Sequence, residues 1–133
     1  MNGRPSTVLW LPDAFGYAAC IPQLLRLVGV TGFFTNKITW SRISGFPHSS
    51  FQWRSPDGSA VLAHVSHEAR QFYNGQATVR ELSDGAESYR QSDVHDAFLA
   101  PTGYGDGGGG PTEEMCERVR RLADLASLPR AQW

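Results

Sequence analysis

Short apolar, β-rich runs alternate along the chain with segments whose apolar residues recur at helical spacing, and this alternation limits the possible folds more than any other feature. Four runs have the length and composition of buried strands: residues 7–11 (TVLWL), 32–35 (GFFT), 60–65 (AVLAHV) and 97–100 (AFLA). Three segments have helical spacing: residues 21–28, 78–89 and 111–125. Strands that alternate with helices indicate a parallel sheet.

Polar residues follow the carboxyl ends of several predicted strands, where parallel α/β folds place their chemistry. They are Asp13, Asn36, Lys37, His67 and Asp106. We therefore predict an α/β fold built as a segment of a (β/α) barrel, with parallel strands and flanking helices. An open doubly wound sheet is the alternative.

Composition argues against several classes of partner. With 12 Lys and Arg against 13 Asp and Glu, the formal net charge is -1, so no field of one sign attracts nucleic acid or an acidic membrane surface. No run approaches the roughly 18 apolar residues that a membrane span needs, and the first residues do not resemble a signal peptide. We expect a cytoplasmic protein, with Cys20 and Cys116 as reduced thiols and a small neutral ligand.

Two aspartates are the candidates for catalysis. Asp13 stands between a proline and a Phe-Gly pair at a strand end, where capping of the following helix is an equally good interpretation. Asp106 lies in the glycine-rich stretch 103–112, which enters a helix. Glycoside hydrolysis uses two carboxylates of this kind, one at the anomeric carbon and one as proton donor and acceptor. Spacing alone leaves open whether the two carboxylates lie about 5 Å apart, as a retaining mechanism requires.

The glycines of 103–112 permit two further interpretations. A glycine-rich loop at a helix N-terminus can cradle phosphate, although this one lacks the Gly-Lys-Ser/Thr ending and the GxGxxG order of the known fingerprints. A phosphate-binding α/β domain is therefore the weaker alternative. The glycines can also let a bulky ligand approach the backbone.

Tryptophans and histidines add weaker signals. Trp10, Trp40 and Trp53 have rings that can stack on sugars, but we expect Trp10 and Trp53 in the core because burial is the commoner use of such rings. His64 ends an apolar strand and is expected to be hydrogen-bonded there. His95 is expected on the surface.

Six ordered motifs resemble those of family 38 glycoside hydrolases, specifically the bacterial and fungal-type branch of these α-mannosidases. They are residues 9–17 (LWLPDAFGY), 21–23 (IPQ), 34–40 (FTNKITW), 46–48 (FPH), 73–75 (YNG) and 103–112 (GYGDGGGGPT). Because the motifs run in family order through most of the chain, the resemblance is to the central part of the catalytic domain.

The resemblance implies a retaining α-mannosidase that hydrolyses terminal α-D-mannosyl linkages of oligosaccharides through a covalent glycosyl-enzyme. Asp13 matches the nucleophile, which in this family also coordinates a zinc ion that grips the 2- and 3-hydroxyls of mannose. Asp106 is aligned with the general acid/base. Lys37 matches a basic residue near the nucleophile, where a cation stabilises the carboxylate anion. Tyr73 and Asn74 match a substrate-contacting loop.

The chain departs from the family in two motifs. It lacks the His-x-Asp zinc motif of the family's first strand and the later His-Asp motif, since His95 and Asp96 precede the glycine-rich stretch and so lie in the wrong order. We expect residues 1–133 to be part of the catalytic barrel of a larger enzyme, with the other zinc ligands outside this chain and no activity in isolation. Open sheet edges then predict self-association or pairing with the remainder of that enzyme. A non-catalytic remnant is the alternative.

Overall fold

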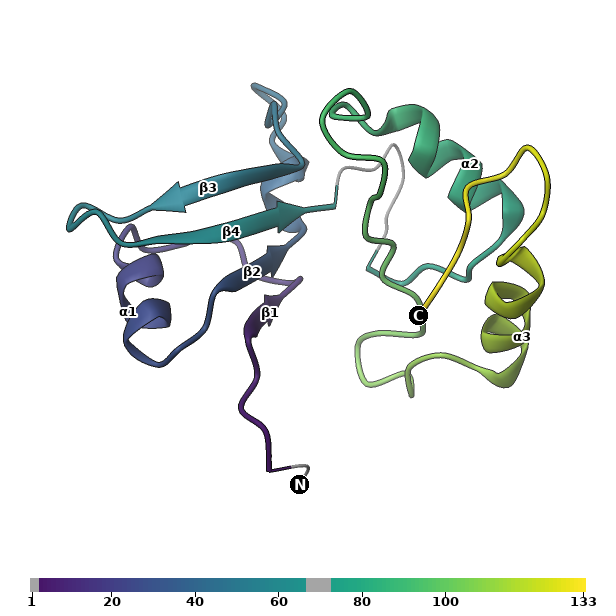
Figure 1. Ribbon diagram of the computed structural model, residues 1–133, viewed down its shortest axis with the longest axis horizontal. Coiled ribbons are helices and arrows are strands. Elements are labelled where there is room, and N and C mark those ends of the chain that lie inside the picture. The colour runs from purple at the N-terminus through teal and green to yellow at the C-terminus, as the bar shows by residue number, and fades with distance from the viewer. Residues whose placement is uncertain (1–2, 67–72) are drawn as a thin grey trace. The chain divides into compact units, whose positions relative to one another are not determined.

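A computed structural model describes residues 3–66 and 73–133 (Figure 1). The chain divides into two compact units, Met1–Ser66 and His67–Trp133, which we call the N-terminal unit and the C-terminal unit. No helix among the described residues is both long enough and apolar enough to cross a membrane.

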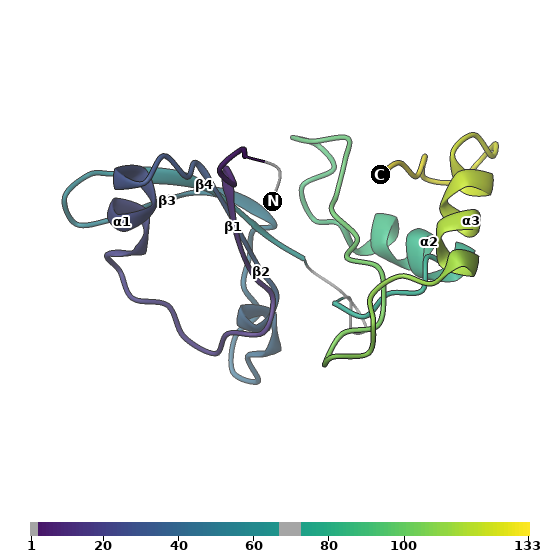
Figure 2. The ribbon, with the colours of Figure 1, turned by 90° about the horizontal axis from the view of Figure 1, so that it is seen from below.

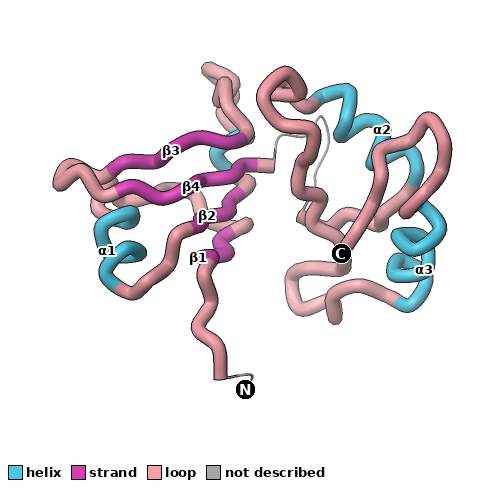
Figure 3. Tube along the Cα trace, viewed as in Figure 1, coloured by secondary structure: helices cyan, strands magenta, loops and turns pink. Residues whose placement is uncertain are grey.

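The N-terminal unit is a four-stranded mixed sheet with one helix against it (Figures 2 and 3). Strands β1 (Val8–Leu11), β2 (Gly32–Thr35) and β4 (Ala60–Val65) are parallel, and β3 (Ser50–Arg54) pairs antiparallel with β4. The order is β1-β2-β4-β3. The three parallel strands confirm the predicted α/β fold, while the described residues show an open sheet and no closure of a barrel.

Helix α1 (Ile21–Leu27) connects β1 to β2 and begins and ends as the sequence predicts. Pro22 occupies the first turn, where its missing N–H is not needed, and Gly29 follows the helix at a φ of 78°, which favours glycine. The helix packs Leu25 onto the sheet. The buried core consists of Leu25, Phe33, Val61 and Ala63.

Strand β3 is the element that the sequence analysis missed. Residues 50–54 alternate in exposure, with Phe51 and Trp53 packed against the core and Gln52 and Arg54 exposed, which is the pattern of a half-buried antiparallel strand. Residues 56–58 form the turn of a hairpin between β3 and β4, because the Ser55 N–H donates to the Ser59 carbonyl at 2.8 Å. The prediction of an all-parallel sheet was therefore wrong at this edge.

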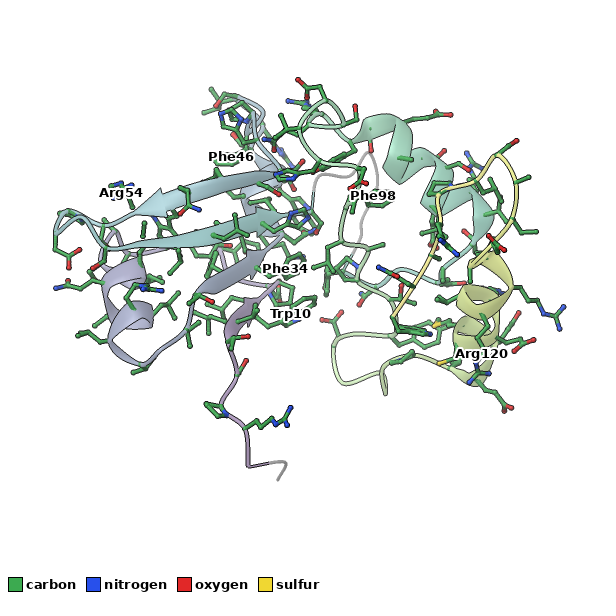
Figure 4. All side chains as sticks on the ribbon, in the orientation of Figure 1. Trp10, Phe34, Phe46, Arg54, Phe98 and Arg120 are labelled. Atoms are coloured by element: carbon green, nitrogen blue, oxygen red, sulfur yellow. The ribbon has the colours of Figure 1, made fainter. Side chains whose placement is uncertain are left out.

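The tryptophan prediction is confirmed for Trp53 and wrong for Trp10. Trp10 is 49% exposed, and its ring stacks on that of Phe34 with 4.0 Å between centroids (Figure 4). His64 follows in the same row across the sheet and is hydrogen-bonded, as expected, with Nδ1 2.8 Å from the Ser50 hydroxyl.

The C-terminal unit contains helices α2 (Val79–Ser88) and α3 (Glu113–Leu122), joined by a long loop (Figure 1). Both helices begin at a threonine cap. Thr78 accepts a hydrogen bond from the Glu81 N–H at 3.2 Å, and Glu81 accepts one from the Thr78 N–H at 2.9 Å. Thr112 likewise accepts from the Met115 N–H. Helix α3 therefore begins two residues later than we predicted.

The predicted strand at residues 97–100 is wrong, since these residues have no strand assignment. Phe98 packs instead against helix α2, so closely that a Cβ added to Gly85 would lie 2.8 Å from its ring. Pro101 has no N–H to offer a ladder. The nearest parallel pairing is the isolated bridge between Gly75 and Thr102. The apolar run thus covers a helix and does not extend a sheet.

Candidate active site

The register of the parallel sheet brings Asp13 and Lys37 together. Leu11 and Thr35 are partners at the carboxyl ends of β1 and β2, and each candidate residue lies two positions beyond its strand. The Lys37 ammonium lies 3.4 Å from Asp13 Oδ1, with 2% of the lysine side chain and 53% of the aspartate side chain exposed. A solvent-facing carboxylate thus lies against a buried cation, which agrees with the basic residue that the resemblance implied near Asp13.

Lys37 also lies against aromatic rings. The 3-10 helix η1 (Lys37–Trp40) places residues three apart on one face, and the ammonium lies 3.6 Å from the centroid of the Trp40 ring. The Phe15 ring is 5.8 Å away. An aromatic face attracts a cation and partly replaces the water that burial removes. Sequence reasoning missed this role of Trp40, although the three-residue spacing from Lys37 was visible.

The loop that carries Asp13 is tied to the end of β2 by Tyr17. The Tyr17 hydroxyl donates to the Ala14 carbonyl at 2.7 Å and is hydrogen-bonded to the Thr35 hydroxyl. Its ring packs edge-on against Phe33 with 5.5 Å between centroids. These contacts hold residues 14–17, which follow Asp13, against the end of β2. Tyr17 belongs to the motif 9–17, but no spacing rule indicated its function.

The helix-capping interpretation of Asp13 is excluded. Helix α1 has Cys20 at its N-cap position and no side-chain cap hydrogen bond, and Asp13 lies seven residues earlier. The carboxylate is therefore not accounted for by a local role in the helix.

Asp106 occupies a tight turn in the C-terminal unit. The Gly108 N–H donates to the Gly105 carbonyl at 2.7 Å, and the two central residues, Asp106 and Gly107, have φ values of 52° and 76°. Positive φ at both central positions defines a type I′ turn, for which Asp-Gly is a preferred pair. Tyr104 and Gly110 pair across the base of the loop. The turn leaves the Asp106 side chain exposed.

The structure brings Tyr73 and Asn74 together with this turn. The Tyr73 hydroxyl donates to the Asp106 carboxylate, at 3.3 Å from Oδ1 and 3.4 Å from Oδ2. Asn74 Oδ1 accepts a hydrogen bond from the Gly105 N–H at 2.7 Å. Three residues that the resemblance assigned to the site therefore form one hydrogen-bonded group.

The loop's own packing requires its glycines. A Cβ on Gly103 would lie 2.6 Å from the Pro111 nitrogen, one on Gly105 2.2 Å from Asn74 Oδ1, and one on Gly108 2.7 Å from the Gly105 carbonyl oxygen. The N–H groups of residues 103, 104, 105, 108 and 110 all donate to acceptors in the protein. These five amides are therefore committed to acceptors of the protein itself.

The described residues do not fit a complete zinc site. Within residues 3–66 and 73–133, no three His, Cys, Asp or Glu side chains converge as metal ligands. In the described part of the chain, Asp13 is the one candidate ligand, and it contacts an ammonium. His95 is exposed, as predicted, and His67 lies outside the described residues. Asp13 and Asp106 belong to different units, so the pairing of the two carboxylates stays a prediction.

The N-terminal unit thus carries a lysine-paired carboxylate at its strand ends, and the C-terminal unit carries a carboxylate on a tyrosine-bonded turn. The chain belongs to glycosyl hydrolase family 38, because the model of that family's N-terminal domain matches residues 1–133.

Curated relatives carry the α-mannosidase name. Alpha-mannosidase G of Dictyostelium discoideum is 40% identical over 131 residues, and human alpha-mannosidase 2C1 is 40% identical over 132 residues. Each alignment covers 98% of this chain and 12% of the relative. The alpha-mannosidase of Saccharomyces cerevisiae is 39% identical over 123 residues, which is 92% of this chain and 11% of the relative. The chain thus spans about an eighth of the length of the proteins it matches.

Proposed function

We propose that this chain is part of the catalytic domain of a retaining α-mannosidase and that Asp13 is its nucleophile. The contact between Asp13 and Lys37 carries the proposal, because an exposed carboxylate held by a buried cation at the end of a parallel strand is placed to attack a bound ligand. Family membership and the names of the relatives support mannose as the sugar.

In the proposed reaction, Asp13 attacks the anomeric carbon while the bond to the leaving oxygen breaks. Asp106 gives its proton to that oxygen, and the product is a glycosyl ester on Asp13. Water, deprotonated by Asp106, then attacks the anomeric carbon and releases Asp13 as a carboxylate. Retention of configuration requires the two carboxyl groups about 5 Å apart. Lys37 stabilises the anion of Asp13 before attack and again after hydrolysis.

Four accompanying proposals concern the rest of the enzyme. Asp13 supplies one zinc ligand and the remaining ligands come from outside this chain. The parallel strands β1, β2 and β4 are neighbouring strands of a larger barrel. The substrate is a mannose-containing oligosaccharide, and the near-neutral charge of the chain suits such a neutral ligand. The proposed location of the enzyme is the cytoplasm.

The test uses a segment-exchange enzyme, in which this chain replaces the corresponding segment of the yeast alpha-mannosidase that it matches. Asp13→Asn is expected to lower turnover of an aryl α-mannoside by about 10³-fold or more. A fluorinated mannosyl fluoride should leave a mannosyl ester on the peptide that contains Asp13, detected by mass spectrometry. The matched control is Asp93→Asn in an exposed loop. Full turnover of the Asp13 variant would remove the nucleophile assignment.

The single candidate zinc ligand among the described residues favours one second function, a non-catalytic remnant that at most binds sugar. Zinc uptake by the 133-residue chain does not separate the two functions, because both place the other zinc ligands outside it. Turnover by the segment-exchange enzyme separates them. The remnant predicts an inactive segment-exchange enzyme, and measurable turnover would contradict it.

A further inference from the structure

We propose that Asn74 is a positioning residue that acts through the turn carrying Asp106. The proposal deepens the proposed function and rests on it, because it assigns Asn74 to the proton-transfer carboxylate. The resemblance had assigned Asn74 to contact with the substrate. Its side-chain oxygen is instead engaged by the backbone N–H of Gly105, at 2.7 Å.

The turn needs an anchor because its conformation is uncommon for a residue with a side chain. Asp106 has a φ of 52°, in the left-handed region that most residues avoid. Aspartate tolerates this region better than most, but the preference is weak. A hydrogen bond to the preceding residue, Gly105, limits the freedom of the backbone at the point where the turn begins.

The contact between Asn74 and Gly105 explains why residue 105 is a glycine. Its φ does not lie in the left-handed region, so backbone conformation alone does not require one there. A Cβ at this position would lie 2.2 Å from Asn74 Oδ1 and 3.2 Å from Cε2 of Tyr73. The glycine lets the amide oxygen reach the backbone.

Asn74 is itself fixed to regular structure. Gly75 next to it accepts a hydrogen bond from the Gly103 N–H at 2.8 Å. The Gln76 N–H donates to Glu81 of α2 at 3.0 Å, and the Gln76 carbonyl accepts from Arg118 of α3 at 3.1 Å. The segment is therefore anchored to both helices, and the hydrogen bond from the Gly105 N–H to Asn74 connects the turn to this anchored segment. Tyr73 then orients the carboxylate from the neighbouring position.

The first experiment uses the 133-residue chain and needs no activity. Hydrogen exchange at the Gly105 amide is measured by NMR in the parent chain, in Asn74→Ala and in Asn74→Asp, which keeps an acceptor oxygen. Protection of this amide is expected to fall about tenfold in the alanine variant and to remain in the aspartate variant. The Gly103 amide, which donates to Gly75, is the internal control. Equal protection of Gly105 in all three chains would overturn the proposal.

A double-mutant cycle tests whether a side chain at residue 105 clashes with that of Asn74. Gly105→Ala alone is expected to destabilise the chain to urea because of its clash with Asn74. In the Asn74→Ala background the oxygen is gone, and the same substitution is expected to have a much smaller effect. Additive effects of the two substitutions would contradict close packing at this point.

The third experiment tests the link to proton transfer in the segment-exchange enzyme. If Asn74 positions Asp106, Asn74→Ala lowers kcat most for aryl mannosides with poor leaving groups, which need the proton, and least for activated ones. A substrate-contacting residue would instead raise KM for every leaving group alike, and that result would overturn the proposal. Failure of the proposed function is seen separately, as full activity of Asp13→Asn.

Discussion

The ammonium nitrogen of Lys37 lies 3.6 Å from the centroid of the Trp40 ring, so the last residue of the 3-10 helix η1 covers the first. Lys37 is the only lysine in the sequence. A buried ammonium is expensive unless other charges or dipoles replace its water. Here the Trp40 ring and the Asp13 carboxylate share that function, which makes the amine a specific probe of the site.

The amine of Lys37 is expected to react slowly with an acylating reagent in the folded chain, because 2% of the side chain is exposed. Trp40→Leu removes the covering ring and should raise the rate of acylation at Lys37 severalfold, measured by mass spectrometry of the peptide. Trp133→Leu, which removes an exposed tryptophan of the other unit, should leave the rate unchanged. Equal rates in the parent chain and Trp40→Leu would show that the ring does not shield the amine.

Lys37→Met is expected to lower kcat/KM of the segment-exchange enzyme by roughly 10- to 100-fold, since it removes the buried cation that lies 3.4 Å from the Asp13 carboxylate. Methionine fills a similar volume without the charge. Lys37→Arg keeps a cation and should retain more activity than the methionine variant. Steady-state kinetics on one aryl α-mannoside give kcat/KM for the three enzymes. An unchanged kcat/KM in the methionine variant would argue against electrostatic support of Asp13.

The effect of Gly85→Ala on the free energy of unfolding is expected to depend on whether the Phe98 ring is present. Alanine is favoured over glycine in a helix by about 1 kcal/mol, but the added Cβ would lie 2.8 Å from the Phe98 ring, and overpacking costs about 1–3 kcal/mol. The substitution should therefore destabilise the parent chain and stabilise a Phe98→Ala chain. Urea unfolding of the four chains measures both effects, and a stabilising effect in the parent would show that the ring moves away freely.

Glu117 is expected to give helix α3 a small stability that depends on pH. Hydrogen bonds from Arg121 and then Arg120, with their charges, lower the pKa of Glu117 from its ordinary value of 4.5. A lowered pKa means that the contribution is present above pH 4.5 and is lost as the pH falls through the lower value. The stability difference between the parent and Glu117→Gln should shrink in acid and in 1 M salt, because these groups are exposed. A difference that is constant with pH would contradict the ion pairs.

Five elements could be predicted from apolar runs and from helical spacing of apolar residues. Strands β1, β2 and β4 and helices α1 and α2 lie within a residue or two of their predicted ranges. Strand β3 was missed because its residues alternate between buried and exposed positions and form no continuous apolar run. Residues 97–100 were wrong because an apolar run alone does not distinguish a strand from a segment that packs on a helix.

Some contacts of the candidate site were also expected from the sequence, and others were not. The meeting of Asp13 and Lys37 was implied by the resemblance, and the paired ends of β1 and β2 supply its structural reason. The contacts of Tyr17, Trp40 and Asn74 could not be predicted, because they depend on where side chains point once the loops have folded. The Asp106-Gly107 pair is typical of a type I′ turn. The surrounding glycines were interpreted as a ligand-binding loop, so this turn was not predicted.

The in-phase pairing of β1 with β2 has an evolutionary consequence. Because Asp13 and Lys37 each lie two residues beyond paired strand ends, the route between the strands, helix α1 included, can lengthen or shorten while the two charges still meet. Inserting one residue between Leu11 and Asp13 would move the carboxylate by a full residue and separate it from the amine. Homologous chains should therefore vary in the length of the connecting segment and keep a constant count of residues at these two junctions.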